Sequence, residues 1–214
     1  MRNTVTPFLV AAMLMLSGRL SAANQPSIEA AAFQYQRKIV YSLQDAAMSM
    51  PDKLFSRVGT GEPVNLEPSY EASLNVFLIV DRSSGRRCLI DAGYGNEKSK
   101  LRRTLAALKI APASIEAIFI THIHPDHVGG LTTEEGTAVF SKATLYIARQ
   151  EYEAWSKDSA RAQLAKHLEP YRERMVLIDY NREISAFGLT PLSMPGHTPG
   201  HTVYRLNAAP GTRL

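Results

Sequence analysis

Five of the six histidines in this 214-residue chain fall in two short motifs, and this clustering constrains the fold more than any other feature of the sequence. The first motif, HIHPDH, begins at His122, and the second, GHTPGH, begins at Gly196. Only His167 lies outside them. Isolated histidines are usually structural or exposed, but two clusters of this kind indicate imidazoles that converge on a shared cation.

The first motif follows an apolar segment, Ile115–Thr121, that is expected to form a short strand. Residues i and i+2 of an extended segment point to the same side. His122 and His124 can therefore both face one cation as this strand ends. In the second motif His197 is the candidate third ligand of that ion. His201 opens a strand, and it is expected to hydrogen-bond to a metal ligand without binding the metal, or to pack in the core.

The residues after His124 suit a turn toward a second cation. Pro125 is compatible with the first turn of a helix, and after this turn Asp126 and His127 can reach an ion beside the first. The pair Gly129–Gly130 lets another segment of backbone pass close by. Asp126 is also the candidate catalytic residue, because it can hold a nucleophile in line while it binds the second ion.

Imidazole and carboxylate ligands suit two divalent ions, with zinc as the first choice and iron or manganese as alternatives. Three histidines around one ion leave a position open for water, and a bound metal lowers the pKa of that water toward neutrality. A purely structural zinc site remains an alternative, although mixed histidine and aspartate ligands favour an open site over a closed thiolate site.

The rest of the chain predicts an α/β fold in which helices cover sheets. Residues 46–70 contain three prolines and two glycines and are expected to form a loop. No glycine-rich phosphate loop follows the early strands, so a nucleotide-binding fold is disfavoured. Strands are expected over residues 37–45, 73–81, 86–91, 115–121, 144–148, 175–179, 189–194 and 201–207, and helices over 96–108 and 149–174, the second with a break near 157–158.

The N-terminus is typical of an export signal. Arg2 is followed by an apolar run, Pro7–Leu16, and then by small residues at Ser21–Ala23. Cleavage after Ala23 leaves one domain over 24–214 and places it in a periplasm or outside the cell; a retained membrane anchor is the alternative. The single cysteine, Cys88, excludes an internal disulfide and is expected to be buried. A net charge of +4 does not indicate nucleic-acid binding.

The sequence from His122 to Leu131 resembles the signature of the metallo-β-lactamase superfamily. The segments Leu89–Gly93, with Asn75 upstream, and Pro195–His201 resemble two further motifs of that family. The resemblance extends from about Arg37 to Leu214. Within the superfamily the branch of methyl parathion hydrolase and the quorum-quenching lactonases is the most similar, judged from Ile120–Leu131 and from the following helix with Glu151 and Trp155.

The resemblance implies an αββα sandwich with the metals at one edge of two facing sheets. It assigns His122, His124 and His197 to the first ion, and Asp126 and His127 to the second. It also implies that Asp91 orients a metal ligand, although a turn-forming aspartate at a strand end is an equal alternative.

The sequence departs from the family in its C-terminal part. The family also uses a bridging aspartate and a later histidine, and neither follows His201 before Leu214. We therefore expect a sandwich that is incomplete at the C-terminus, with weak metal retention, as in a truncated gene product.

The first functional hypothesis is hydrolysis of a lactone, ester, amide or phosphotriester by a metal-bound hydroxide. The partner is then a small molecule, with neither nucleic acid nor, after signal cleavage, a membrane involved. A β-lactamase, a thioester hydrolase and an inactive remnant are the alternatives. Trp155, Tyr152 and Phe140 are candidates for an apolar substrate pocket or for the core. The substrate, native metal and oligomeric state stay open.

Overall fold

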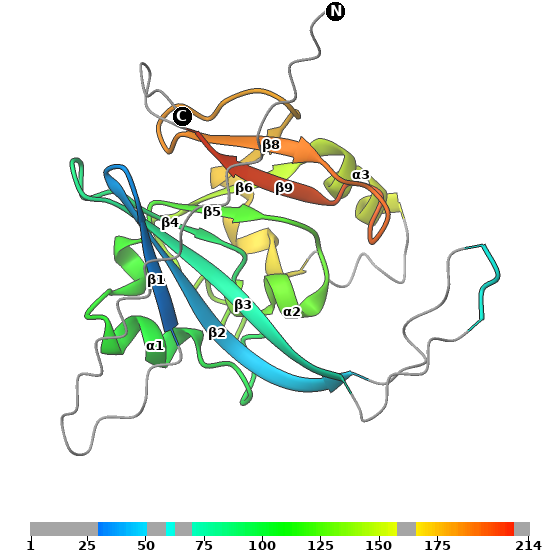
Figure 1. Ribbon diagram of the computed structural model, residues 1–214, viewed down its shortest axis with the longest axis horizontal. Helices are drawn as coiled ribbons and strands as arrows, with labels where there is room; N and C mark the ends of the chain where they lie inside the picture. The colour runs from blue at the N-terminus through cyan, green and yellow to red at the C-terminus, as the bar shows by residue number, and fades with distance from the viewer. Residues whose placement is uncertain (1–29, 51–58, 63–69, 158–165, 208–214) are drawn as a thin grey trace, which may run out of the picture.

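The computed structural model describes residues 30–50, 59–62, 70–157 and 166–207. The predicted signal peptide lies outside these residues. Nine strands are described, in a seven-stranded and a two-stranded sheet (Figure 1). The first sheet has the order β1 (Ala30–Tyr35), β2 (Lys38–Met50), β3 (Tyr70–Asp81), β4 (Arg87–Ile90), β5 (Ala117–Ile120), β6 (Thr144–Ala148), β7 (Met175–Ile178), and the second pairs β8 (Leu189–Ser193) with β9 (Thr202–Leu206).

Short helices connect the strands of the second half of the large sheet. Strands β1 to β4 pair antiparallel, whereas β4 to β7 pair parallel, as the predicted hairpin followed by strand–helix–strand units requires. The helical segments are α1 (Leu101–Ala107), η2 (Pro112–Ser114), α2 (Pro125–Val128), η3 (Gly129–Leu131), α3 (Arg149–Lys157) and η5 (Glu169–Arg174).

At β5 the two faces of the large sheet are buried against different partners. Ile118 and Ile120 point into a cluster that includes Leu101 and Leu105 of α1. The alternate residue Phe119 points to the opposite face, where it packs against β8–β9 and the residues before them. Because both faces are covered, β5 is apolar at every position, as expected of a central parallel strand. Helices, the large sheet and β8–β9 therefore form successive layers.

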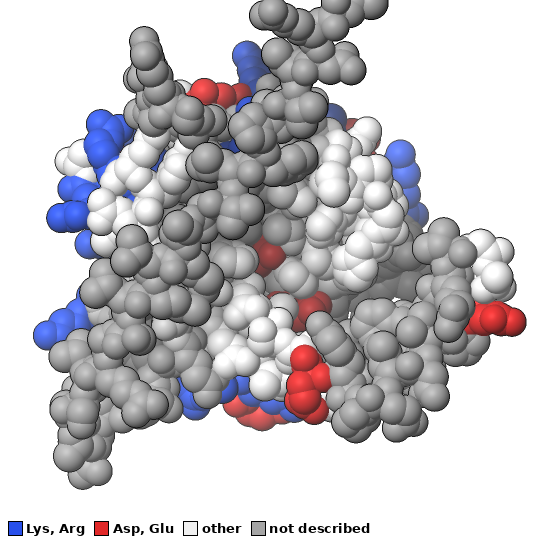
Figure 2. Space-filling view, viewed as in Figure 1, with Lys and Arg blue, Asp and Glu red and all other residues white. Residues whose placement is uncertain are grey.

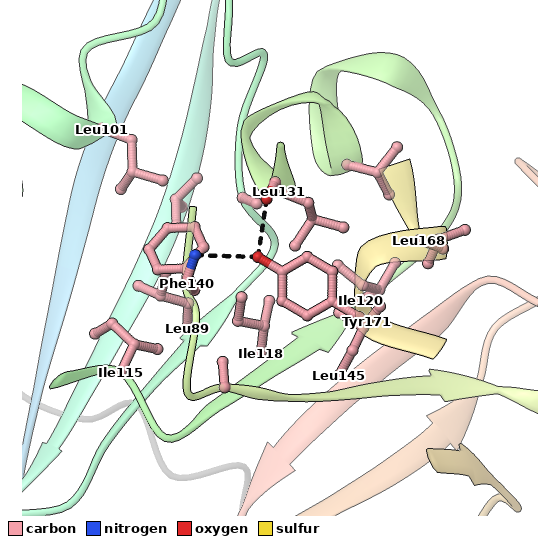
Figure 3. Packing of buried hydrophobic residues seen from close by; sticks show 14 of the residues in the cluster. Leu89, Leu101, Ile115, Ile118, Ile120, Leu131, Phe140, Leu145, Leu168 and Tyr171 are labelled. Atoms are coloured by element: carbon pink, nitrogen blue, oxygen red, sulfur yellow. Dashed lines mark hydrogen bonds between the residues drawn. The ribbon is translucent and has the colours of Figure 1, made fainter. Parts of the chain in front are cut away.

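Tyr171 of η5 ties the helical side of the core together (Figure 3). Its hydroxyl donates a hydrogen bond to the Leu131 carbonyl at 2.8 Å and accepts one from the Phe140 N–H at 3.1 Å. Burial raises the pKa of Tyr171 to about 12, so the hydroxyl keeps its proton. Phe140, a candidate pocket residue, is fully buried in this core.

A buried carboxylate, Asp45 of β2, organises the segment before α1. Its Oδ1 accepts hydrogen bonds from the Ser99 hydroxyl and the backbone N–H groups of Lys100 and Leu101, and its Oδ2 accepts the N–H of Tyr94. These contacts hold the preceding residues around Asp45 and satisfy free N–H groups at the start of α1. The helix predicted over 96–108 therefore begins later, at Leu101.

Two further predictions are wrong in part. The predicted loop over 46–70 is strand as far as Met50, because β2 passes a bulge at Gln44/Ala46 and continues its pairing with β3. Residues 51–58 and 63–69 lie outside the described residues. For the helix predicted over 149–174, α3 ends at Lys157, where the break was predicted, and residues 158–165 lie outside the described residues. Its last part, η5, is a 3-10 helix and not an α-helix. The prediction of a buried Cys88 is confirmed.

The described surface is mixed in charge. On the face in Figure 2, Lys and Arg side chains lie around the periphery, with Asp and Glu between them. Among the described helices, none has the length and apolar character needed to cross a bilayer.

Candidate metal centre

The two histidine motifs meet at the end of β5. The first motif leaves this strand, and its Pro125 starts α2 directly after an extended His124 (Figure 1). The second motif forms the connection between β8 and β9. The Thr202 N–H donates to the Thr121 carbonyl at 2.9 Å, and the Tyr204 hydroxyl donates to the Ile120 carbonyl at 2.9 Å. These bonds hold the second motif beside the first.

Three imidazoles from the two motifs converge. One ring nitrogen each of His122, His124 and His197 lies within 4.8 Å of the others. Nε2 of His197 lies 2.9 Å from Nδ1 of His124 and 3.2 Å from Nε2 of His122. His122 is buried, His124 is half-buried and His197 is exposed. The predicted convergence of these three side chains is therefore present in the fold, and its outer edge is open to solvent.

A hydrogen bond at Nδ1, on the side away from His197, orients the ring of His122. The Thr121 hydroxyl lies 2.9 Å from Nδ1 of His122 and donates to Oδ2 of Asp91 at 2.8 Å. Burial and the neighbouring imidazoles lower the pKa of His122 to about 2, so its ring is neutral at ordinary pH. A neutral imidazole with one nitrogen held from behind presents the lone pair of its other nitrogen to a ligand.

His127 has a different environment, although its ring centroid lies only 3.9 Å from that of His122. Its Nδ1 is 2.8 Å from Oδ2 of Asp91, and its Nε2 is 3.4 Å from Oδ2 of Asp126. Burial lowers the pKa of His127, but hydrogen bonds to Asp126 and Asp91 outweigh it and raise the pKa to about 10. Burial likewise opposes ionisation of Asp126, but hydrogen bonding to His127 leaves its pKa lowered.

Asp91 connects these two environments. Its Oδ1 accepts the Thr121 N–H at 2.8 Å, and its Oδ2 contacts both the Thr121 hydroxyl and His127. Its backbone has φ 63°, a left-handed conformation that aspartate tolerates better than most residues. The side chain is buried and aimed at the histidines.

The close backbone approach predicted for Gly129 and Gly130 is confirmed. A Cβ atom at Gly130 would overlap the carbonyl oxygen of Ala92, and one at Gly129 would overlap that of Tyr94. The Gly130 N–H donates to the Gly93 carbonyl at 3.0 Å. Glycine is required here because the segment after Asp91 packs directly against the first motif.

The remaining candidate residues lie at different distances from the centre. The ring of His201 lies beside the cluster, 5.0 Å from that of His122. Trp155 meets His124 edge to face at 5.4 Å. Tyr152 is half-buried against the helical side of the core, and Phe140 lies within that core. A cavity of about 300 Å³ adjoins the centre and is lined by His124, Gly196, His197, Thr198 and Pro199.

One polar residue at the centre was not predicted as a site residue. Glu151 is fully buried, and its carboxylate contacts both motifs. The sequence signal was the pair Glu151 and Trp155, four residues apart and thus on one face of α3. Trp155, which lies on the same face of α3, packs against His124. A carboxylate on that face, one turn away, therefore also lies close to the histidine motifs.

A layered α/β fold with clustered histidines at the end of a central strand is typical of metal-dependent hydrolases. The model of the metallo-beta-lactamase superfamily matches residues 71–212. The chain belongs to this superfamily.

Curated relatives include an N-acyl homoserine lactonase of a Bacillus species, 29% identical over 111 residues, which are 49% of this chain and 38% of the relative. A hydroxyacylglutathione hydrolase of Salmonella arizonae is 30% identical over 130 residues, which are 61% of this chain and 42% of the relative. The chain thus spans about two fifths of the length of these two relatives.

Solved structures support the fold. The hydrolase AbOPH of the beta lactamase superfamily superimposes with a TM-score of 0.72 at 24% identity, over 86% of this chain and 72% of the other. AidC, a dizinc quorum-quenching lactonase, gives a TM-score of 0.73 at 20% identity, over 85% and 71%. The predicted α/β class and metallo-β-lactamase fold are confirmed.

Proposed function

We propose that the centre at the end of β5 binds divalent metal and hydrolyses a small ester-like substrate, with a lactone as the first candidate. The observation that carries this proposal is the convergence of His122, His124 and His197, whose ring nitrogens lie within 4.8 Å of one another. Two motifs far apart in the sequence supply these nitrogens. Membership of the superfamily and the lactonase and hydrolase relatives support the same reaction class.

The donor set suits a divalent cation such as zinc. Three imidazoles with one shared open side match the ligands of a zinc site that keeps a position for water or substrate. The lowered pKa of both His122 and His124, caused first by burial, keeps these rings neutral and able to bind metal. Asp126 and His127, which lie next to this group, are the proposed ligands of a second ion. A cation bound here supplies an activated water and polarises the substrate oxygen.

The chain's own residues have separate tasks in this proposal. Thr121 and Asp91 hold His122 in one orientation through their hydrogen bonds. Asp126 orients the attacking water and receives its proton. His201 supports the cluster from the side, and Trp155 restricts the movement of His124 by edge contact.

The cavity favours a small substrate. Its volume of about 300 Å³ is at the lower end of the range for small-molecule sites. Exposed His197 borders this cavity, so a bound carbonyl group lies next to the histidines. We also propose, from the N-terminal sequence, that the protein acts after export to a periplasm or to the medium.

The experiment compares metal binding and hydrolysis in the full chain. Zn²⁺ affinity is measured by competition with a chromophoric chelator, and turnover is measured on an N-acyl homoserine lactone, a phosphotriester, a β-lactam and a thioester. We expect lactone hydrolysis that a chelator abolishes and Zn²⁺ restores. His197→Ala removes both binding and turnover, whereas His167→Ala, outside the motifs, keeps them. A folded, Zn²⁺-loaded chain that hydrolyses none of the four substrates contradicts the proposed reaction.

A further inference from the structure

The carboxylate of Glu151, on α3, connects the two histidine motifs. Its Oε1 accepts hydrogen bonds from the Ile123 N–H at 2.9 Å and from Nε1 of Trp155 at 2.6 Å. Its Oε2 accepts hydrogen bonds from the Thr198 hydroxyl at 2.7 Å and from the Gly200 N–H at 2.9 Å. The side chain is fully buried. An ionised carboxylate can accept about four hydrogen bonds, so these donors use its whole capacity.

These contacts lie directly behind the three converging imidazoles. Ile123 separates His122 from His124 in the first motif, and Thr198 follows His197 in the second. One carboxylate therefore bridges the two backbones that present these rings. The separation between Nδ1 of His124 and Nε2 of His197 is 2.9 Å.

The second motif has little freedom to move away from α3. A Cβ atom at Gly200 would overlap the backbone nitrogen and Cα of Glu151, so only glycine allows this approach. The Gly200 carbonyl in turn accepts hydrogen bonds from the hydroxyls of Tyr180 at 2.9 Å and Thr202 at 3.0 Å. The segment is thus held on both sides, and the carboxylate adds a side-chain contact to the first motif beside the backbone contacts of β9.

We propose that Glu151 is a positioning residue that sets the separation of His124 and His197, and through it the affinity of the three-histidine group for a divalent cation. The affinity part rests on the proposed function, whereas the hydrogen-bonded link belongs to the metal-free chain. Groups that orient metal ligands from behind typically contribute about 10- to 100-fold in metal affinity.

Glu151→Gln tests this link with almost no change in volume. Glutamine replaces one acceptor oxygen by an NH₂ group, which is itself a donor. This NH₂ group must then face either the donors at Oε1 or the donors at Oε2 of the original carboxylate. The Thr198 hydroxyl can reverse and accept, but the N–H groups of Gly200 and Ile123 and the indole of Trp155 cannot. The amide therefore turns its NH₂ toward Thr198, and the Gly200 N–H loses its acceptor.

Two measurements on the full chain follow. Amide hydrogen exchange of the chelator-treated protein should become faster at Gly200 in Glu151→Gln and stay close to wild type at Ile123. Zn²⁺ affinity, measured by chelator competition with Zn²⁺ alone, should fall about 10- to 100-fold. Glu153→Gln, an exposed position on the same helix, is the matched control and should change neither.

The outcomes separate this inference from the proposed function. A wild-type chain that binds no Zn²⁺ contradicts the proposed function and the affinity claim with it. A wild-type chain that binds Zn²⁺, with unchanged affinity in Glu151→Gln, overturns the positioning role alone. If Glu151→Gln does not fold, Thr198→Val removes one donor and keeps the other three. It should weaken Zn²⁺ binding by a smaller factor, and wild-type affinity in this variant also overturns the inference.

Discussion

His122 and His127 are neighbours at the same strand end, yet their surroundings give them opposite protonation behaviour. Burial and adjacent imidazoles lower the pKa of His122 to about 2. Burial acts on His127 in the same direction, but the hydrogen bonds to Asp126 and Asp91 outweigh it and raise the pKa to about 10. Because burial acts in the same direction on both rings, the difference comes from the hydrogen-bond partners of His127.

This comparison divides the centre into two halves with different tasks. The three-histidine half consists of His122, His124 and His197, whose ring nitrogens lie within 4.8 Å of one another at an edge open to solvent. The carboxylate half consists of Asp91, Asp126 and His127, in which each carboxylate lies within ion-pair distance of the imidazole. In the proposed function the first half binds the cation, whereas in the metal-free second half a protonated His127 balances one of the two carboxylate charges.

Single substitutions that remove an imidazole should have the largest effect on Zn²⁺ affinity, and the effect should differ between the two halves. His122→Ala deletes a ligand of the three-histidine half, so we expect Zn²⁺ affinity and turnover to fall by about 100-fold or more, above the usual effect of a supporting residue. His127→Ala should weaken binding less, because the three-histidine half remains intact. Chelator competition measures both variants. Equal losses in the two variants would contradict the division into halves.

Two glycines test the backbone contacts of the two motifs. Gly200→Ala forces the second motif away from Glu151, and Gly130→Ala forces the first motif away from Ala92. Each should reduce the free energy of unfolding by about 1–3 kcal/mol, the usual range for overpacking. Only Gly200→Ala should also weaken Zn²⁺ binding strongly, because it separates the motifs that share the three-histidine half.

Urea denaturation and chelator competition provide the two readouts for these glycine variants. Gly136→Ala is the control, since a Cβ atom there meets open space and only the φ of +79° is strained, at roughly 1 kcal/mol. If Gly200→Ala were as stable as wild type, the packing of the second motif against α3 would be refuted.

The opposite pKa shifts predict opposite pH slopes in the stability of chelator-treated protein. The pKa of His127 is raised from 6.5 to about 10, so its stabilisation is complete below pH 6.5 and is lost as pH rises toward 10. The pKa of His122 is lowered from 6.5, so the unfolded chain binds that proton more readily and stability falls as pH drops below 6.5.

Urea denaturation across this pH range checks both slopes. His127→Gln should flatten the decline on the alkaline side, and His122→Gln should flatten the decline on the acidic side. The same slope in wild type and His127→Gln above pH 7 would show that His127 is not protonated in the folded protein.

The reaction of the Cys88 thiol should show the smallest change among these measurements. Because Cys88 lies outside both halves, its reactivity reports on folding alone. Burial raises the pKa of its thiol to about 12, and its side chain lies between the large sheet and β8–β9. We expect negligible reaction with an aromatic disulfide reagent at pH 8 until urea unfolds the chain. The histidine variants should keep this protection. Rapid labelling of a variant in buffer would mean that its lost metal affinity reflects unfolding instead of a missing ligand.

Sequence patterns predicted the elements that depend on local periodicity. The strand expected over 144–148 has the same bounds in the structure as β6. The convergence of the two histidine motifs also followed from sequence, because alternation places His122 and His124 on one side of an extended segment. The roles assigned to His122, His124, Asp126, His127 and His197 as ligands stay predictions until metal binding is measured.

The contacts between distant segments could not be predicted from local sequence patterns. Neither Asp45 nor Glu151 was predicted as a site residue, yet each accepts hydrogen bonds from backbone far away in the chain. Phe140 illustrates the reverse case, since an aromatic residue suits a pocket or a core equally well in sequence. Burial decided in favour of the core.

By itself the sequence determined which chemical groups are present and which of them share a local face, since both follow from residue type and spacing. Tertiary structure alone decided the opposite pKa shifts of His122 and His127 and the distance between the motifs. The physical reason is that desolvation and hydrogen bonding depend on every segment packed around a group, and these segments come from separate parts of the chain.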